Sequence, residues 1–334
     1  MRKMQCWAAL ALFAASLSAC AELQKPRDST SPGSKKVEIL RVTCFEADQD
    51  ANLKACRDLL RMRPNEGKTE DRIGWMLLNR GDIPEGMAHL WMAVRLSPRE
   101  AVYQYHYAVG LEKRGNRAES EEAYRKAVEL KPDYPEAKLA LGVVLRKVGK
   151  KEESMTTFQE ILKKDPGSAT TWGQLSLTLA QMDRSAEAIA AARQAVELQP
   201  EDPNARSNLG LFFVNANQAD QGIEHLQKAL ELEPNNPKAL YNLALAYTQT
   251  NSLEEAARAF YRALVLKDSF GEAHHSLGVI LLSLGLCSEC REHLDRSHAL
   301  GVKSESLVLD RFKEMCDPTA NKAAEPPAAG KIQG

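Results

Sequence analysis

Residues 203–236 read "PNARSNLGLFFVNANQADQGIEHLQKALELEPNN", and this stretch decides the fold. Apolar residues recur at helical spacing in its first half, a polar turn follows at 215–218, and the helical spacing then returns. Pro234 cannot continue a helix and so ends the second one. We therefore expect two antiparallel helices, with Phe213 and Leu226 filling the space between them.

The same pattern recurs every 34 residues along the chain. Small residues keep this period at three positions, represented here by Gly210, Gly222 and Ala229, where two helix backbones could approach closely. Prolines keep it too, at Pro64, Pro98, Pro132, Pro166, Pro200 and Pro234. The period and the helix–turn–helix unit resemble the tetratricopeptide repeat. The resemblance implies an all-α fold, a right-handed superhelical solenoid of antiparallel helix pairs.

Counting in this period predicts the domain organisation. Seven repeats cover 67–304 without an insertion, after a degenerate helical cap at 37–66 whose second helix lies near 50–62. Residues 305–316 are expected to form a C-terminal capping helix, because the ends of a solenoid need a polar outer face. The Pro- and Ala-rich tail, 317–334, is expected to be disordered.

The N-terminus has the features of an export signal. Residues 1–19 combine a charged start with a short apolar run, too short to cross a bilayer as a helix. Leu17-Ser18-Ala19-Cys20 resembles the bacterial lipobox, which implies that Cys20 is acylated, for example with palmitate, and becomes the mature N-terminus. In that family Ala21 after the cysteine favours the outer membrane, with the body facing the periplasm. Residues 20–36 would be a flexible tether, and an ordinary secretory signal is the alternative.

Five further cysteines suggest disulfide staples in an oxidising compartment. Cys44 and Cys56 lie on facing helices of the cap and are predicted to pair. Cys316 is predicted to pair with Cys290 or, as the alternative, with Cys287. A second hypothesis takes Cys287 and Cys290 as a thiol–disulfide pair, although this CxxC does not follow a thioredoxin-like strand.

Other chemistry is not indicated. The chain contains no GxSxG, HExxH, P-loop or Rossmann glycine pattern, so we expect neither an enzyme nor a cofactor. The histidines near the CxxC fit a tetrahedral metal site poorly, so no metal is expected. The formal net charge of −1 offers no basic footprint for nucleic acid.

The repeat family implies a binding groove lined by the first helix of each unit, through positions 2, 5, 6, 9, 12 and 13. Asn208 and Asn242 at position 6 resemble an asparagine ladder that binds an extended peptide backbone. Tyr105 and Tyr241 at position 5 offer aromatic contacts. Position 9 is apolar in every unit and includes Leu177, Leu211 and Leu245. The alternative is that these apolar residues only pack between neighbouring helices.

These patterns favour a lipid-anchored adaptor that binds another envelope protein or a peptide segment and meets the membrane through its anchor. Similar architecture occurs in the pilotin lipoproteins of type IV pilus secretins and in lipoproteins that recruit peptidoglycan-remodelling enzymes. A structural spacer without a groove ligand is the third alternative.

Overall fold

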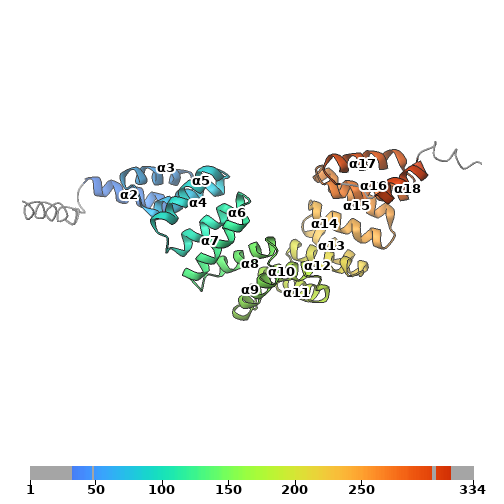
Figure 1. The fold of residues 1–334 in the computed structure, drawn as a ribbon, viewed down its shortest axis with the longest axis horizontal. Helices are drawn as coiled ribbons and strands as arrows, with labels where there is room; N and C mark the ends of the chain where they lie inside the picture. Colours follow the sequence, from blue (N-terminus) through green and yellow to red (C-terminus); the bar gives the residue numbers. More distant parts are fainter. Residues whose placement is uncertain (1–31, 47–48, 303–305, 317–334) are drawn as a thin grey trace, which may run out of the picture. The chain divides into compact units, whose positions relative to one another are not determined.

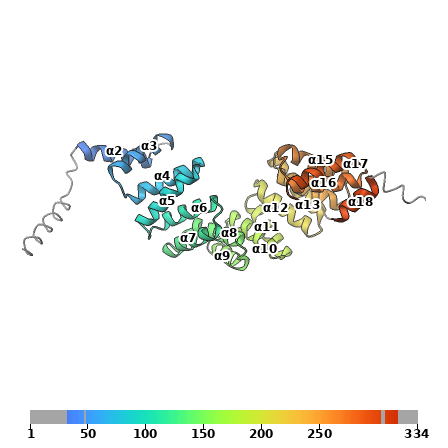
Figure 2. The same ribbon diagram turned by 45° about the horizontal axis from the view of Figure 1, so that its top comes forward.

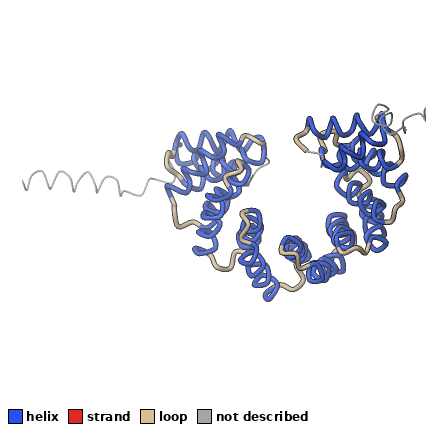
Figure 3. Tube along the Cα trace, turned by 45° about the vertical axis from the view of Figure 1, so that its right-hand side comes forward, coloured by secondary structure: helices blue, strands red, loops and turns tan. Residues whose placement is uncertain are grey.

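The computed structural model describes residues 32–46, 49–302 and 306–316. Within these ranges the chain folds only into α-helices joined by turns, with no strand (Figure 3). This confirms the predicted all-α class. None of the helices in these ranges is long and apolar enough to cross a membrane.

The chain divides into two compact units, residues 1–137 and 138–334, with the boundary inside α8 (Figure 1). The helices of the first unit are α2 (Pro32–Glu46), α3 (Gln49–Met62), α4 (Gly67–Arg80), α5 (Ile83–Leu96), α6 (Ala101–Lys113) and α7 (Arg117–Leu130). Helix α8 spans Pro135–Lys147. The second unit continues with α9 (Lys151–Lys164), α10 (Ala169–Gln181), α11 (Ser185–Leu198), α12 (Pro203–Asn215), α13 (Ala219–Leu232), α14 (Pro237–Gln249), α15 (Leu253–Leu266), α16 (Gly271–Ser283), α17 (Cys287–Ala299) and α18 (Ser306–Cys316).

Within each repeat, one left-handed residue turns the chain from the first helix into the second. These residues have φ angles of 57° to 89° and occupy the same repeat position. They are Gly81, Gly115, Gly149, Asp183, Asn217, Asn251 and Gly285. Glycine, asparagine and aspartate are the residues that adopt this conformation at least cost. A single position therefore fixes where each helix pair reverses.

Small residues allow the two helices of a pair to approach closely. A Cβ atom added at Gly210 of α12 would lie 2.6 Å from Cγ of Leu226 and 3.0 Å from the carbonyl oxygen of Gly222, both in α13. Phe213, Leu226 and Ala229 are buried between the helices. The packing predicted for residues 203–236 is thus present.

The N-terminal cap begins earlier than the sequence indicated. Helix α2 starts at Pro32, so residues 32–36, expected to belong to the tether, form its first turn. A proline at a helix start loses no hydrogen bond, because the first amide groups have no partner within the helix. Val37 then anchors the helix in a core shared with α3 and α4. Figure 2 shows α2 and α3 lying side by side.

Helix α18 covers the end of the second unit. Val308, Phe312 and Cys316 pack against the apolar cluster of α14–α17. The guanidinium of Arg291 lies 4.9 Å from the centre of the Phe312 ring, which is cation–π geometry. The signal segment 1–19 and Cys20, most of the tether and the tail 317–334 lie outside the described residues.

Candidate functional site

The candidate site is the surface formed by α10, α12 and α14, which we call the amide surface. It contains Gln174 and Leu177 of α10, Asn208 and Leu211 of α12, and Tyr241, Asn242 and Leu245 of α14. Every one of these side chains is half-buried. The three helices are the first helices of consecutive repeats, so the repeat itself brings equivalent positions into one row.

The apolar residues at position 9 are not confined to the interior. All seven are half-buried: Trp75, Val109, Val143, Leu177, Leu211, Leu245 and Val279. Leu177 and Leu245 touch the neighbouring cores while part of each side chain remains exposed. Part of each side chain in this stripe is therefore accessible to a ligand, in addition to its packing contacts.

Among the half-buried amides of the groove positions on α10, α12 and α14, Asn208 and Asn242 are the two whose donor and acceptor groups are both unused. Within the described part of the chain, neither amide is hydrogen-bonded to another residue. The neighbouring amides differ: Gln174 accepts from Arg146 at 3.0 Å, and Gln249 donates to the carbonyl of Val214 at 2.9 Å. An amide offers both a donor and an acceptor, the two groups needed by one peptide unit of a bound strand.

Gln174 was not predicted from the sequence, although it occupies the same repeat position as Asn208 and Asn242. The oxygen of the Gln174 amide accepts a hydrogen bond from Arg146, whereas its nitrogen remains able to donate to a ligand. The signal was present in the sequence as a third amide at position 6.

The amide surface is almost free of charge. The groove positions of α10, α12 and α14 carry amides, hydroxyls and apolar groups, and Lys238 is the one charged residue among them. They are Thr170, Gly173, Gln174, Leu177, Ala180, Gln181, Asn204, Ser207, Asn208, Leu211, Val214, Asn215, Lys238, Tyr241, Asn242, Leu245, Thr248 and Gln249. Recognition here would depend on main-chain hydrogen bonds and apolar contact rather than on ion pairing.

Tyr241 is held in place by neighbouring rings. Its centroid lies 4.8 Å from that of Phe270 and 5.6 Å from that of Phe260. A ring packed in this way presents a fixed surface, so little side-chain entropy is lost on binding.

Tyr105, the remaining predicted groove residue, lies in the first unit and belongs to a different cluster. Its ring packs 5.2 Å from Tyr134 and 5.7 Å from His106. His106 stacks on Trp75 at 4.1 Å, and its Nδ1 lies 2.8 Å from the Asp71 carboxylate. Burial, followed by the charges of nearby carboxylates, raises the pKa of Tyr105, so its hydroxyl stays protonated.

The cysteines form two disulfides in the described residues. Cys44 pairs with Cys56, as predicted. Cys316 pairs with Cys287, and Cys290 is a free, buried thiol, so the Cys290–Cys316 pairing is wrong. The helix carrying both candidates turns Cys290 inward against the core of α16 and leaves Cys287 at the first turn, within reach of α18.

This arrangement argues against the thiol–disulfide hypothesis. Burial raises the pKa of the Cys290 thiol, which suppresses the nucleophilic thiolate. Cys287, the other cysteine of the CxxC, is bonded to Cys316 and is therefore not a free thiol. Among the described residues, no group of three or more His, Cys, Asp or Glu side chains could hold a metal ion.

Comparison with known proteins places this architecture in a family. A family model for the middle TPR-like domain of cilia and flagella-associated protein 70 matches residues 85–199, and a tetratricopeptide repeat model matches residues 212–273. The chain is a tetratricopeptide repeat protein. Tetratricopeptide repeat proteins are protein-interaction scaffolds and are typically not enzymes. No curated protein sequence matches the chain significantly.

Solved structures share the fold at low sequence identity. The Cut9–Hcn1 hetero-tetramer of the APC/C superposes with a TM-score of 0.64 at 17% identity, covering 84% of this chain and 55% of that one. The chain thus spans about half the length of that relative. A tetratricopeptide repeat protein from Parabacteroides merdae gives a TM-score of 0.61 at 12% identity, covering 74% and 97% of the two chains. At these identities the likeness concerns the fold alone.

Proposed function

We propose that this tetratricopeptide repeat protein is a lipid-anchored adaptor of the bacterial envelope that holds an extended segment of a partner protein on its amide surface. The observation that carries the proposal is the pair of unpartnered, half-buried amides, Asn208 and Asn242, on consecutive repeats. A half-buried amide without a partner loses some hydration and gains no bond in return. An extended backbone would satisfy both of them.

The apolar row beside the amides supplies the second contact. Leu177, Leu211 and Leu245 present half-exposed side chains on the same three helices as the amide positions. A strand bound through its backbone directs alternate side chains to the same side, where they could contact this row. Since the surface carries almost no charge, we expect the bound segment to be uncharged and apolar at alternate positions.

The anchor is a separate part of the proposal and rests on the sequence. Acylation of Cys20 would hold the repeats at a membrane surface, and stable anchoring needs more than one acyl chain. Ala21 after the cysteine favours the outer membrane with the repeats facing the periplasm. The partner would be a secretin or pilus component if the protein acts as a pilotin, or a cell-wall enzyme if it acts as a recruiter.

The test is photo-crosslinking in the native host from a photoreactive residue placed at position 211. We expect one dominant adduct, which mass spectrometry would identify as an envelope protein. Leu211→Glu would place a charge on the apolar row, and Asn208→Ala with Asn242→Ala would remove both unpaired amides. Each change should weaken binding of the captured partner by at least tenfold without changing the helical content, which circular dichroism would verify.

Matched variants separate this surface from general effects. Leu198→Glu adds the same charge at an exposed leucine of α11, and Asn235→Ala removes an amide in an exposed turn. Both should bind as well as the wild type. If the Asn208, Leu211 and Asn242 variants also retain full binding, the amide surface is not the site.

A further inference from the structure

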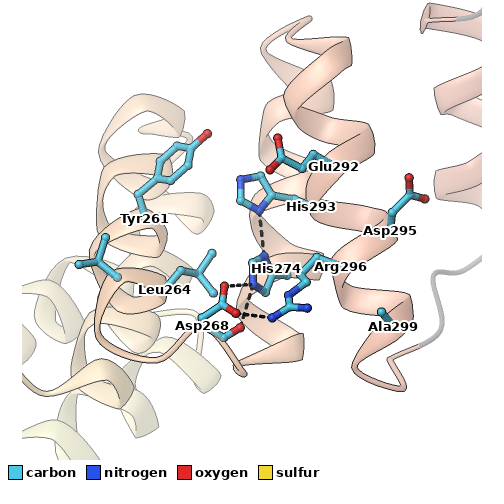
Figure 4. Close-up of a pocket in the computed structure, with 10 residues that line it drawn as sticks. Tyr261, Leu264, Asp268, His274, Glu292, His293, Asp295, Arg296 and Ala299 are labelled. Carbon is cyan, nitrogen blue, oxygen red and sulfur yellow. Dashed lines mark hydrogen bonds and ion pairs between the residues drawn. The ribbon is translucent and has the colours of Figure 1, made fainter.

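A cavity lies between the second helices of the last two repeats, away from the amide surface. We call it the C-terminal hollow; its volume is about 720 Å³. Leu264 of α15 lies on one side, and Glu292 and His293 of α17 lie on the other (Figure 4). Val265 of α15 and Asp295 of α17 also line the cavity. His274 of α16 lies at the base.

The same hollow occurs two repeats earlier, where it is half the size. This upstream hollow, of about 350 Å³, is lined by Arg193, Glu197, Glu224 and His225 among others. Glu224 and His225 precede Glu292 and His293 by two repeat lengths, and Arg193 and Glu197 precede Tyr261 and Val265 by the same distance. The two cavities are therefore equivalent sites of the repeat.

In the upstream hollow the chain supplies its own cation. The guanidinium of Arg193 lies 5.3 Å from the centre of the Phe213 ring, against which His225 also stacks at 5.5 Å. The guanidinium thus packs on an aromatic ring in a cavity that Glu197 and Glu224 also line. Arginine suits this position because its planar group stacks on rings and donates hydrogen bonds at its edge.

In the C-terminal hollow this cation is missing. Tyr261 replaces the arginine, and its hydroxyl donates to Glu289 at 2.8 Å. Val265, which is 86% exposed, stands where the six preceding units carry a charged side chain. Those residues are Arg61, Arg95, Glu129, Lys163, Glu197 and Glu231. An exposed valine at a charged position, beside a cavity of doubled volume, marks a surface that is specialised in this repeat.

The charges around the C-terminal hollow favour a cation. Arg296 is held in an ion pair by Asp268. Glu292 and Asp295 are exposed and form no ion pair or hydrogen bond with other residues of the described ranges. Two carboxylates on the same wall are therefore available to a ligand.

Two histidines lie next to these carboxylates and are hydrogen-bonded to each other. Nε2 of His274 lies 3.0 Å from the carbonyl oxygen of Asp268, which can only accept, so Nε2 carries the proton. Nδ1 of His274 lies 2.9 Å from Nδ1 of His293, so the two rings share a hydrogen bond. The other nitrogen of His293, Nε2, points away from His274 on the side of Tyr261 (Figure 4). Burial is the main cause of the lowered pKa of His293, so the neutral form prevails near pH 7.

We propose that the C-terminal hollow binds an arginine side chain of a partner protein, in the place that Arg193 fills in the upstream hollow. The guanidinium would donate to Glu292 and Asp295 beside the His293 ring, and its aliphatic stem would lie against Val265 and the neighbouring apolar wall. Several donors in a planar fork match separate acceptors better than the single ammonium of lysine. The site is independent of the amide surface, so either could fail without the other.

The experiment is a titration of the full chain, labelled with ¹³C-histidine, followed by NMR of the imidazole resonances. The probe is acetyl-Gly-Arg-Gly-amide, and its matched controls contain citrulline or lysine in place of arginine. The His293 resonance, assigned with His293→Gln, should shift saturably with the arginine peptide at millimolar concentration. Citrulline should give no shift, because it lacks the charge, and lysine should bind at least threefold more weakly.

Two variants with the same substitution test the location. Val265→Lys places a cation at the wall of the C-terminal hollow, at an exposed position where another repeat carries Lys163, and should weaken arginine binding at least tenfold. Glu197→Lys makes the equivalent change in the upstream hollow and should leave the His293 titration unchanged. An equal response to citrulline or lysine, an unaltered titration in Val265→Lys, or no shift with arginine would each overturn the proposal.

Discussion

The close approach of α12 and α13 gives a quantitative test of how the repeat is packed. Gly210 lies inside α12, and Gly173 lies inside α10. Gly173 precedes Gly210 by 37 residues, which is one repeat and three further residues. An alanine in either helix gains about 1 kcal/mol of helix propensity over glycine. The two sites differ in the space available to the added methyl group.

At Gly173 nothing lies within 4 Å of the place that an added methyl group would occupy, so Gly173→Ala should stabilise the protein by about 1 kcal/mol. At Gly210 the methyl carbon would lie 2.6 Å from Cγ of the fully buried Leu226 and 3.0 Å from the Gly222 carbonyl oxygen. Relieving an overlap of this kind costs about 1–3 kcal/mol. Because the propensity gain is common to both variants, the difference between them isolates the overlap, and we expect Gly210→Ala to be less stable than Gly173→Ala by about 2 kcal/mol.

Urea unfolding followed by circular dichroism measures both variants against the wild type. Repeat arrays can unfold in parts, so the slope of the transition must be compared before midpoints are converted into free energies. Equal stability of the two variants, with equal slopes, would refute the view that α12 and α13 need a glycine where they touch.

Two more predictions concern buried groups of the second unit. Replacing Cys6 and Cys20 by serine leaves Cys290 as the one cysteine outside the two disulfides. In this Cys6→Ser/Cys20→Ser chain, Cys290 should react with a thiol reagent only after denaturation, because it is buried and burial raises its pKa. Rapid labelling of the native chain would contradict this placement. Burial also lowers the pKa of His225 below that of an unfolded chain, so the unfolded state takes up the proton first and stability falls as the pH drops below about 6.5. His225→Gln should make this loss shallower between about pH 7.5 and 5, measured by urea midpoints, and an unchanged slope would show that His225 does not contribute.

Much of the fold could be predicted because the residues that define each helix pair lie close together in the sequence. The 34-residue period, the small residues and the helix-ending prolines define the repeats without knowledge of distant contacts. The turn residues, such as Gly149 and Asn217, are an equally local signal, of which only the polar turn at 215–218 entered the prediction. The Cys44–Cys56 pairing was also predictable, because both residues belong to one helix hairpin.

Side-chain rotation and packing between elements decided the rest. Cys287 and Cys290 are three residues apart on one helix, and only the packing of α18 against α17 determines that Cys287 meets Cys316. Likewise, the sequence showed that Asn208 and Asn242 occupy a groove position, but only the structure shows that both are half-buried and unpaired while Gln174 and Gln249 form hydrogen bonds. The period of this sequence determined which residues occupy equivalent places. The tertiary structure decided which of them have partners, because partners are contributed by helices whose relative rotation no single repeat encodes.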